Sequence, residues 1–374
     1  MADSNPAISV ETVGANPVRF WGLDTGERVR RMAAKADLGG VGAPAVLANA
    51  DHVFDPAWLA HVARHPGMAV TLGGIPVLAH ARDEGEAAAV RAAMRGEKQL
   101  PPAFEAIAYE DGAEIENKAL RKRERPFLLE LTPETRRTAE RASYFGAYKG
   151  VTDFLTLYLW PEVALWLTRL ACRLGMTPNM VTAIGAALCI AATVLFAQGE
   201  YWWGMALGLV FMVLDTVDGK LARCTITSSW WGNVFDHGID LVHPPFWWWF
   251  WTTGLVHWGL GLSDTLFWWV QGTLLVGYVA QRLVEGIFMR RYGGMHIHVW
   301  RRFDSRFRLI TARRNPNMVI LFVAMLFGRP DMGIVLVAVW TAVSFAVHLI
   351  RLGQAIQREK RGQAITSWLA GETA

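Results

Sequence analysis

The sequence predicts an all-α six-helix transmembrane bundle with a small N-terminal soluble α/β domain. Of its 374 residues, 52% are hydrophobic and only 19% are charged, and the apolar residues concentrate after about residue 175. A bilayer core of about 30 Å is crossed by a helix of about 20 residues. Six apolar segments are expected to cross within a domain at 177–355, and they lie at 179–198, 202–221, 233–256, 265–287, 315–328 and 331–351.

Residues 1–145 show the alternation of short apolar runs and turn residues that is typical of a small soluble domain. The expected elements, in chain order, are a strand at 46–51, a helix beginning at Asp55 and Pro56, strands at 68–72 and 75–79 around Gly73-Gly74, and a helix at 84–94. Strands that alternate with helices in this way predict an α/β domain.

Residues 146–176 connect this domain to the first apolar segment, and they are predicted to hold an amphipathic helix. From Pro161 to Leu174, apolar residues recur at helical spacing. An apolar stripe with Trp and basic residues, just before a membrane span, is typical of a helix that lies in the membrane interface. Packing of this helix on the soluble domain is the alternative interpretation.

Positive charge predicts the orientation of the spans. The connection between the fourth and fifth apolar segments carries eight arginines, while the loops at 199–201, 257–264 and 329–330 are nearly free of positive charge. By the positive-inside rule, the arginine-rich connection is cytoplasmic. An even number of spans then places both termini, including a tail at 356–374, in the cytoplasm of a multi-pass protein of the cell (inner) membrane.

Four carboxylates interrupt this apolar sequence, at Asp215, Asp218, Asp236 and Asp240. A carboxylate at membrane depth costs about 2.5–3.5 kcal/mol on insertion scales, so four of them need a compensating partner. Steps of three and four residues place each pair on one face of its helix, and two facing helices would gather four oxygen donors. Such a donor set suits a hard divalent cation, Mg²⁺ first and Mn²⁺ as the alternative. Ordinary ion pairs with Lys220 and Arg223 are the competing interpretation.

The surrounding pattern, D-x2-D-G-x2-A-R-x8-G-x3-D-x3-D, resembles the signature of the CDP-alcohol phosphotransferases, also called CDP-alcohol phosphatidyltransferases. Every signature position is present in register, and the resemblance covers about residues 150–350. It implies a metal-dependent integral membrane enzyme that moves a substituted phosphate from a CDP-alcohol to a second alcohol and releases CMP. The resemblance further implies that Asp215, Asp218, Asp236 and Asp240 are metal ligands for two ions and that Asp240 is also the general base.

The same resemblance implies roles for residues around the carboxylates. Those that would line the cytidine diphosphate are Gly219, Ala222, Arg223 and Gly232. Asn179 and Thr182 belong to a segment that looks like the family's TPN-x-[VI]-T element, and they are expected either to contact the nucleotide or to cap the first span. Arg313 and Arg314 are expected either to form a phosphate or acceptor pocket or to mark the membrane edge.

The N-terminal domain resembles part of a sugar-nucleotidyltransferase domain, with Asp51 at the position of an aspartate that helps to bind metal and nucleotide. The G-x-G phosphate loop that opens such a domain is missing from residues 1–45, where the segment 39–42 is the nearest candidate. We therefore expect a degenerate domain without catalytic activity rather than an active one.

The donor alcohol is left open between two classes. CDP-diacylglycerol would react with a polar acceptor such as inositol phosphate or glycerol phosphate, whereas CDP-inositol would be a soluble donor. The resemblance to fusions of these two domains that act in inositol phosphodiester synthesis favours an inositol-type substrate. The expected process is phospholipid or inositol phosphodiester synthesis. The expected partners are the CDP-alcohol donor, an alcohol or alcohol-phosphate acceptor and the lipid bilayer. A homodimer is compatible with the sequence, and no nucleic-acid partner is expected.

A non-catalytic membrane protein is the alternative from a different functional class. It would be a scaffold for the soluble domain, or a transporter with an acidic metal site. Transport would require charged sites near the bilayer midplane. The four carboxylates are instead predicted at the cytoplasmic end of the second and third spans, which favours the enzyme.

Overall fold

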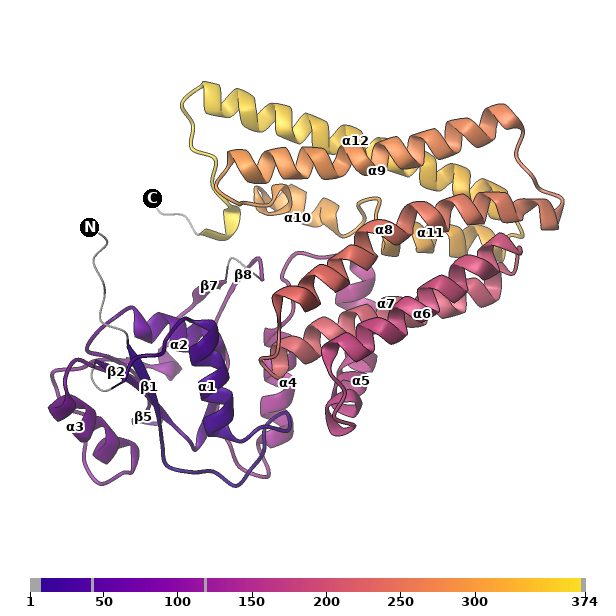
Figure 1. Cartoon of the computed structure of the whole chain (residues 1–374). Helices are drawn as coiled ribbons and strands as arrows, with labels where there is room; N and C mark the ends of the chain where they lie inside the picture. The colour runs from indigo at the N-terminus through magenta and orange to yellow at the C-terminus, as the bar shows by residue number, and fades with distance from the viewer. Residues whose placement is uncertain (1–7, 42–43, 118–119, 371–374) are drawn as a thin grey trace. The chain divides into compact units, whose positions relative to one another are not determined.

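The computed structural model describes residues 8–41, 44–117 and 120–370, which are mainly helical with a small N-terminal α/β region (Figure 1). The chain divides into two compact units. The first comprises residues 1–148, 169–175 and 220–228, and the second comprises residues 149–168, 176–219 and 229–374. The outer ends of the predicted domain and tail, at 1–7 and 371–374, lie outside the described residues, as does Gly42.

A five-stranded mixed sheet forms the centre of the first unit. Its strand order is β1-β2-β5-β4-β6, with β1–β2 and β4–β6 parallel and the other pairs antiparallel. The strands are β1 (Ser9–Val13), β2 (Ala45–Asn49), β4 (Met68–Leu72), β5 (Ile75–Ala81) and β6 (Glu105–Ala108). Three of them, β2, β4 and β5, lie where strands were predicted, so the α/β prediction for this region is confirmed.

Helices cover both faces of this sheet because successive side chains of a strand point to opposite sides. In β2, Val46 joins one core cluster and Leu47 joins the other. The first cluster includes residues of α1 (Thr25–Lys35) and α2 (Pro56–Ala63), and the second includes residues of α3 (Glu84–Met94). An aspartate side chain caps the N-terminus of each helix, and these caps are Asp24, Asp55 and Asp83. The predicted helices at Asp55 and at 84–94 are thereby confirmed.

The other described elements of this unit are short. They are β3 (His52–Phe54) paired with β9 (Leu128–Glu130), β7 (Ile115–Asn117) paired with β8 (Lys122–Glu124), the 3-10 turn η1 (Tyr109–Asp111) and α4 (Arg136–Gly146). Asp51 lies in the turn between β2 and β3, where Asn16 Nδ2 donates to its carboxylate at 3.3 Å. The glycines at 39 and 40 follow α1 rather than a strand, unlike a phosphate loop.

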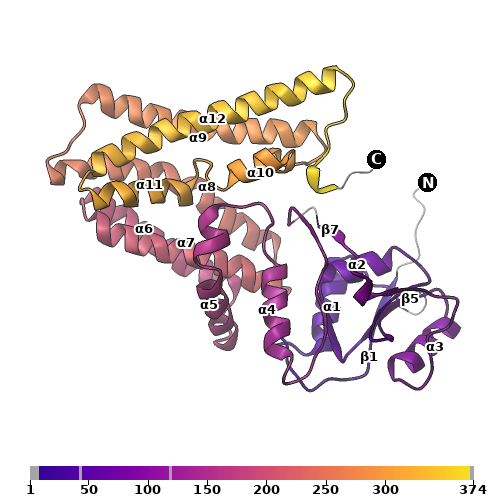
Figure 2. The same cartoon turned by 180° about the vertical axis from the view of Figure 1, so that it is seen from behind.

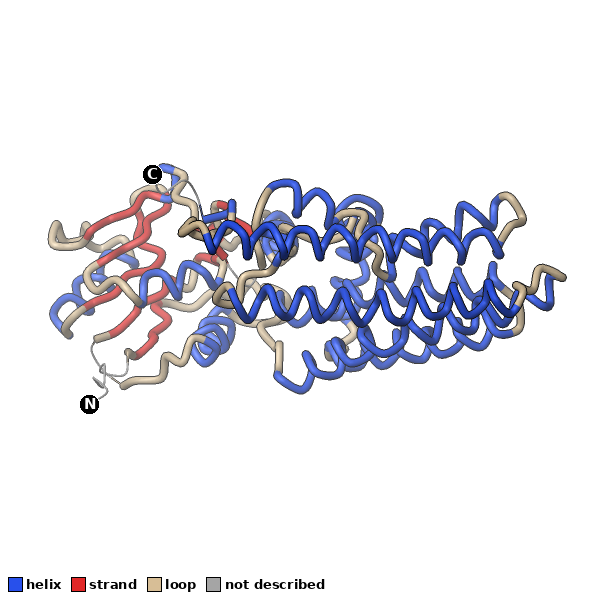
Figure 3. The backbone as a smooth tube through the Cα atoms, turned by 90° about the horizontal axis from the view of Figure 1, so that it is seen from above, coloured by secondary structure: helices blue, strands red, loops and turns tan. Residues whose placement is uncertain are grey.

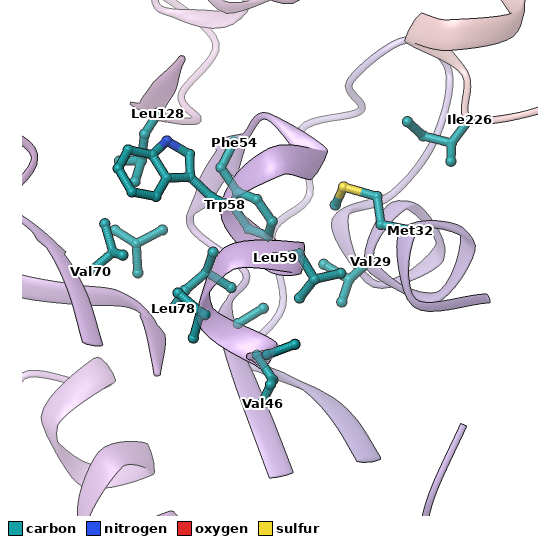
Figure 4. Packing of buried hydrophobic residues seen from close by; sticks show 14 residues of the cluster. Val29, Met32, Val46, Phe54, Trp58, Leu59, Val70, Leu78, Leu128 and Ile226 are labelled. Atoms are coloured by element: carbon teal, nitrogen blue, oxygen red, sulfur yellow. The ribbon is translucent and has the colours of Figure 1, made fainter. Parts of the chain in front are cut away.

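The core of the first unit includes one residue from far along the chain. Ile226 is 6% exposed and packs in the same cluster as Val29 and Met32 of α1 (Figure 4). Its φ angle is 54°, in the left-handed region that a β-branched side chain rarely adopts. Such a conformation is unfavourable by about 1–3 kcal/mol and persists where the surrounding structure holds it in place.

Among the described residues, six helices coincide with the six predicted apolar segments and account for most of the second unit. They are α6 (Pro178–Ala197), α7 (Tyr201–Cys224), α8 (Trp230–Gly254), α9 (Asp264–Arg291), α11 (Arg314–Leu326) and α12 (Pro330–Lys360). The other elements are η2 (Leu155–Leu159), α5 (Pro161–Arg173), η3 (Leu255–Trp258), η4 (Ile297–Val299), α10 (Arg302–Arg308) and η5 (Trp368–Ala370). Helix α12 is longer than the predicted span and includes the first residues of the predicted tail.

Length and apolar composition qualify two described helices, α6 and α12, as candidate membrane spans, and α11 is apolar but shorter. The six helices are confirmed as helices, while crossing of the membrane by all six stays a prediction. The predicted helix of the 146–176 segment exists as α5. Its Trp166 is exposed, as a membrane-interface position requires, whereas Arg169 pairs with Glu140 of α4 at 3.1 Å.

Seen from above, the long helices extend in similar directions (Figure 3), and α9 lies against α12 along much of its length (Figure 1 and Figure 2). A small residue permits this close approach. A Cβ atom at Gly277 of α9 would lie 2.7 Å from Thr341 Cγ2 of α12, which is closer than a real contact allows. Helices α6 and α8 form a second packed pair.

Helix α8 contains two consecutive prolines in its interior, Pro244 and Pro245. Proline has no N–H, so the carbonyls four residues earlier, at Asp240 and Leu241, cannot receive their usual helical hydrogen bonds. The Tyr278 hydroxyl of α9 donates to the Leu241 carbonyl at 2.9 Å and replaces one of them. Beyond the prolines, Trp247 and Trp251 are fully buried and anchor the second half of the helix.

Candidate active site

Three of the predicted carboxylates meet between α7 and α8. Oxygen atoms of Asp215, Asp236 and Asp240 lie within 4.8 Å of one another. The spacing along each helix produces this arrangement, because a step of four residues keeps Asp236 and Asp240 on one face of α8. Carboxylate oxygens converging at this distance are the donor set that hard divalent cations prefer, so the residues fit Mg²⁺ or Mn²⁺.

Arg314, the first residue of α11, bridges two of these carboxylates. Its guanidinium donates to Asp240 Oδ1 at 2.6 Å and to Asp215 Oδ2 at 2.7 Å. The competing interpretation paired the aspartates with Lys220 and Arg223, but Asp215 and Asp240 take Arg314 instead. One guanidinium cannot balance three carboxylates, so the cluster keeps an excess of negative charge that a divalent cation could neutralise.

Asp218 is buried beside this group but is not one of its three members. The Thr182 hydroxyl of α6 donates to Asp218 Oδ2 at 2.6 Å. Asp218 still lines the same small pocket as Asp215 and Asp236. The structure therefore brings all four predicted aspartates to one place, with Asp218 held from a third helix. Their metal-binding roles stay predictions.

The cap of α6 is Thr177, whose side chain accepts a hydrogen bond from the Met180 backbone N–H. The expectation that Asn179 or Thr182 caps this helix is therefore wrong, because the cap lies one residue before Pro178, the first helical position. Asn179 instead lies against the start of α8. A Cβ atom at Gly232 would lie 3.0 Å from Asn179 Oδ1, so a larger residue there would press on the Asn179 side chain.

The remaining predicted nucleotide residues lie in the last turns of α7. Gly219 follows Asp218 directly, and Ala222 lies four residues after Asp218, on the same face of the helix. Arg223 donates through Nε to the Ala147 carbonyl at 3.1 Å. Contact of these residues, and of Gly232, Asn179 and Thr182, with a cytidine nucleotide stays a prediction.

A chain of hydrogen bonds that the sequence did not indicate holds Arg314 in place. Arg314 Nε donates to Asn315 Oδ1 at 3.0 Å, and Asn315 Nδ2 donates to Asp153 Oδ1 at 3.1 Å. Burial would raise the pKa of the Asp153 carboxyl, but Arg308 and hydrogen bonds from Thr156 and Asn315 outweigh burial and lower it. Asp153 therefore stays charged and fixes the amide that orients Arg314. Its only sequence signal is the pattern Asp-x-x-Thr before a helical turn.

Arg313 precedes Arg314 but belongs to another cluster. Its guanidinium donates to Glu285 Oε2 at 2.6 Å and lies 3.3 Å from His298 Nε2. Glu285, His298 and His348 have ligand atoms within 4.8 Å of one another, a spacing that could hold a metal ion. Arg282 is also near, 3.4 Å from Glu285. Two arginines around one carboxylate leave an excess of positive charge, which suits an anion better than a metal cation.

An apolar groove of about 580 Å³ lies between α6 and α8. Its lining includes Ile190 and Val194 of α6 and Val242 and Phe246 of α8. Ile239 lines both this groove and the small pocket of the aspartates. An elongated apolar group could therefore occupy the groove while a polar group attached to it reaches the carboxylates.

Comparison with known proteins adds independent information. The model of the family described as CDP-alcohol phosphatidyltransferase matches residues 175–347. The chain is 30% identical over 173 residues to an archaetidylinositol phosphate synthase of Pyrococcus horikoshii, which covers 46% of this chain and 81% of that protein. It is 37% identical over 95 residues to a phosphatidylinositol phosphate synthase of Streptomyces avermitilis, covering 25% of this chain and 37% of that protein.

A third relative is cholinephosphotransferase 1 of Mus musculus, which is 35% identical over 103 residues, or 25% of this chain and 24% of that protein. The chain thus spans between 24% and 37% of the length of the last two relatives. The aspartate pattern lies inside the matched region, and residues before 175 lie outside it.

Proposed function

Because this chain belongs to the CDP-alcohol phosphatidyltransferase family, we propose that it transfers a substituted phosphate from a CDP-alcohol to an acceptor alcohol and releases CMP. The observation that carries the proposal is the convergence of Asp215, Asp236 and Asp240 within 4.8 Å, inside the region that matches the family. We further propose that α6 to α9, α11 and α12 form six membrane spans, with the active site and both termini facing the cytoplasm.

The four aspartates would hold divalent metal, either Mg²⁺ or Mn²⁺. The family pattern suggests two ions. When bound, the metal would neutralise the negative charge of the diphosphate. Asp240 is the proposed base, because its side chain is 43% exposed, compared with 20% for Asp215 and 29% for Asp236. An incoming hydroxyl can reach Asp240 most easily and pass its proton to that carboxylate. Arg314, which donates to Asp240 at 2.6 Å, would also donate to the phosphate oxygens of the donor.

The apolar groove favours a lipid-linked donor such as CDP-diacylglycerol over CDP-inositol. Ile239 connects the groove to the carboxylate pocket, so an acyl chain and a diphosphate could be bound together. The positive charge excess around Arg313 favours an acceptor that carries a phosphate. Two relatives are named as inositol phosphate lipid synthases, which agrees with inositol phosphate as the acceptor.

The test is an assay of CMP release by the purified full-length protein in detergent. We expect release with CDP-diacylglycerol plus inositol phosphate or glycerol phosphate, no release in EDTA, and recovery with Mg²⁺ or Mn²⁺. Full turnover in EDTA would contradict the metal role, and activity with CDP-inositol alone would contradict the lipid donor. The N-terminal domain is proposed to have no nucleotidyltransferase activity. Pyrophosphate release from CTP would contradict this proposal. The homodimer stays a prediction for mass measurements in detergent.

A further inference from the structure

The first compact unit contains a short segment from the middle of the chain. Residues 220–228, which include the connection between α7 and α8, belong to this unit together with the N-terminal α/β region. Ile226 at the centre of the connection is buried in the core cluster that contains Val29 and Met32 (Figure 4). An apolar side chain buried in this way ties the connection to α1.

Three basic side chains of α1 bind the same connection. Arg28 Nη1 donates to the Cys224 carbonyl at 2.7 Å, and Arg31 Nη1 donates to the Thr225 carbonyl at 3.0 Å. Lys35 Nζ donates to Ser228 Oγ at 2.7 Å. Steps of three and four residues place the three side chains on one face of α1. That face therefore follows the connection from the end of α7 almost to the cap of α8.

These contacts persist at neutral pH, and they hold the backbone of Ile226 in an unfavourable conformation. Burial lowers the pKa of Arg28 to about 10, so the guanidinium remains charged at neutral pH. The carbonyls at the end of a helix lack helical partners, and a charged donor satisfies them well. Ile226 has a φ of 54°, which an isolated connection would leave. Contacts with α1 and with the core of the first unit keep Ile226 in this conformation.

We propose that the N-terminal domain acts as a clamp on the α7–α8 connection and that Arg28, Arg31 and Lys35 are positioning residues for the aspartate cluster. The connection joins the helix that carries Asp215 and Asp218 to the helix that carries Asp236 and Asp240. Fixing it sets the register between the two pairs, which metal coordination requires. The proposal gives the domain a role without nucleotidyl transfer, and it rests on the proposed function for its link to catalysis.

The test uses Ile226→Ala and the double variant Arg31→Gln/Lys35→Gln in the full-length protein. We expect several-fold faster hydrogen–deuterium exchange at residues 229–240 and about tenfold weaker Mn²⁺ binding measured by electron paramagnetic resonance. Ile226→Val should restore both values. Arg30→Gln is the matched control, since Arg30 lies on α1 with its side chain 71% exposed and pairs only locally with Glu27 in the described structure.

The double variant leaves the buried core intact, so it decides the question if Ile226→Ala does not fold. Unchanged exchange at 229–240 together with wild-type Mn²⁺ affinity in the folded double variant would overturn the clamp. These readouts do not depend on turnover. Absence of CMP release by the unmodified protein would therefore reject the proposed function and leave the exchange data to decide the clamp.

Discussion

Arg313 and Arg314 are neighbours in the sequence, yet their guanidinium groups bind two different clusters. Arg314 lies between Asp215 and Asp240, where carboxylates are in excess. Arg313 binds Glu285 beside His298, where Arg282 adds a second positive charge. One cluster is therefore suited to a metal cation and the other to an anionic group, although each contains an arginine–carboxylate pair.

Backbone conformation separates the two side chains. Arg313 is the N-cap of α11, with extended φ and ψ of −141° and 172°, whereas Arg314 is the first helical residue. The change from extended to helical backbone turns consecutive side chains in different directions. Two identical residues at the start of a helix can therefore bind two unlike sites. The residue pair alone does not indicate which arginine binds the carboxylate cluster and which binds the positive one.

The largest effect should come from the acidic cluster. Asp236→Asn keeps the size of the side chain but removes one negative charge from the three convergent carboxylates. We expect CMP release to fall by about 10²–10³-fold, as when an electrostatic stabiliser of a transition state is lost. The measurement is the steady-state rate at saturating metal. Asp264→Asn, at an exposed position of α9, is the control, and equal losses in both variants would reject the assignment.

A smaller loss is expected from Arg314→Lys. Lysine has a single charged nitrogen and cannot contact Asp215 and Asp240 from two nitrogen atoms held in a plane, as this guanidinium does. We expect kcat/KM to fall about 10- to 100-fold, the range for residues that orient metal ligands. Arg329→Lys at the start of α12 provides the comparison, because Arg329 pairs only with Asp331 in the described structure. If Arg314→Lys leaves kcat/KM unchanged, Arg314 has no role in catalysis beyond its contribution of positive charge to membrane orientation.

Arg313→Lys should separate the two clusters. If the positive cluster binds the acceptor phosphate, the KM of the phosphorylated acceptor should rise about tenfold, equivalent to about 1.4 kcal/mol. The KM of the CDP donor should change less than twofold, because Arg313 contacts none of the aspartates in the described structure. Equal changes in both KM values would show that the clusters are not independent.

The smallest effect concerns pH. Burial lowers the pKa of His298 well below its usual range, although Glu285 acts in the opposite direction. The folded protein then binds fewer protons than the unfolded chain, so stability is lost as the pH falls below about 6.5, by at most about 1.4 kcal/mol per pH unit. Thermal unfolding between pH 5 and 8 should show less acid sensitivity in His298→Gln. The exposed His257→Gln should keep the acid sensitivity of the unmodified protein.

Local sequence predicted much of this structure. Pro178 and Gly199 bound the apolar run that became α6, and the spacing of Asp236 and Asp240 was enough to place both in one cluster. Contacts between distant residues could not be inferred from one sequence. Arg314 lies 74 residues from Asp240 and 99 from Asp215, and no periodicity connects them. Ile226 was equally hidden, because an apolar residue in a short connection gives no sign that another domain buries it.

The two prolines of α8 remove two backbone hydrogen bonds between the half of the helix that carries Asp236 and the half that carries the buried tryptophans. Trp247 and Trp251 hold the far half in the core, while the near half carries Asp236 eight residues before Pro244. Eight helical residues span about 12 Å, so a tilt of about 5° at the prolines would swing Asp236 by about 1 Å. Displacements of that size change catalytic rates by about 10²-fold. A slight bend at the prolines would therefore displace the carboxylates far enough to change the catalytic rate.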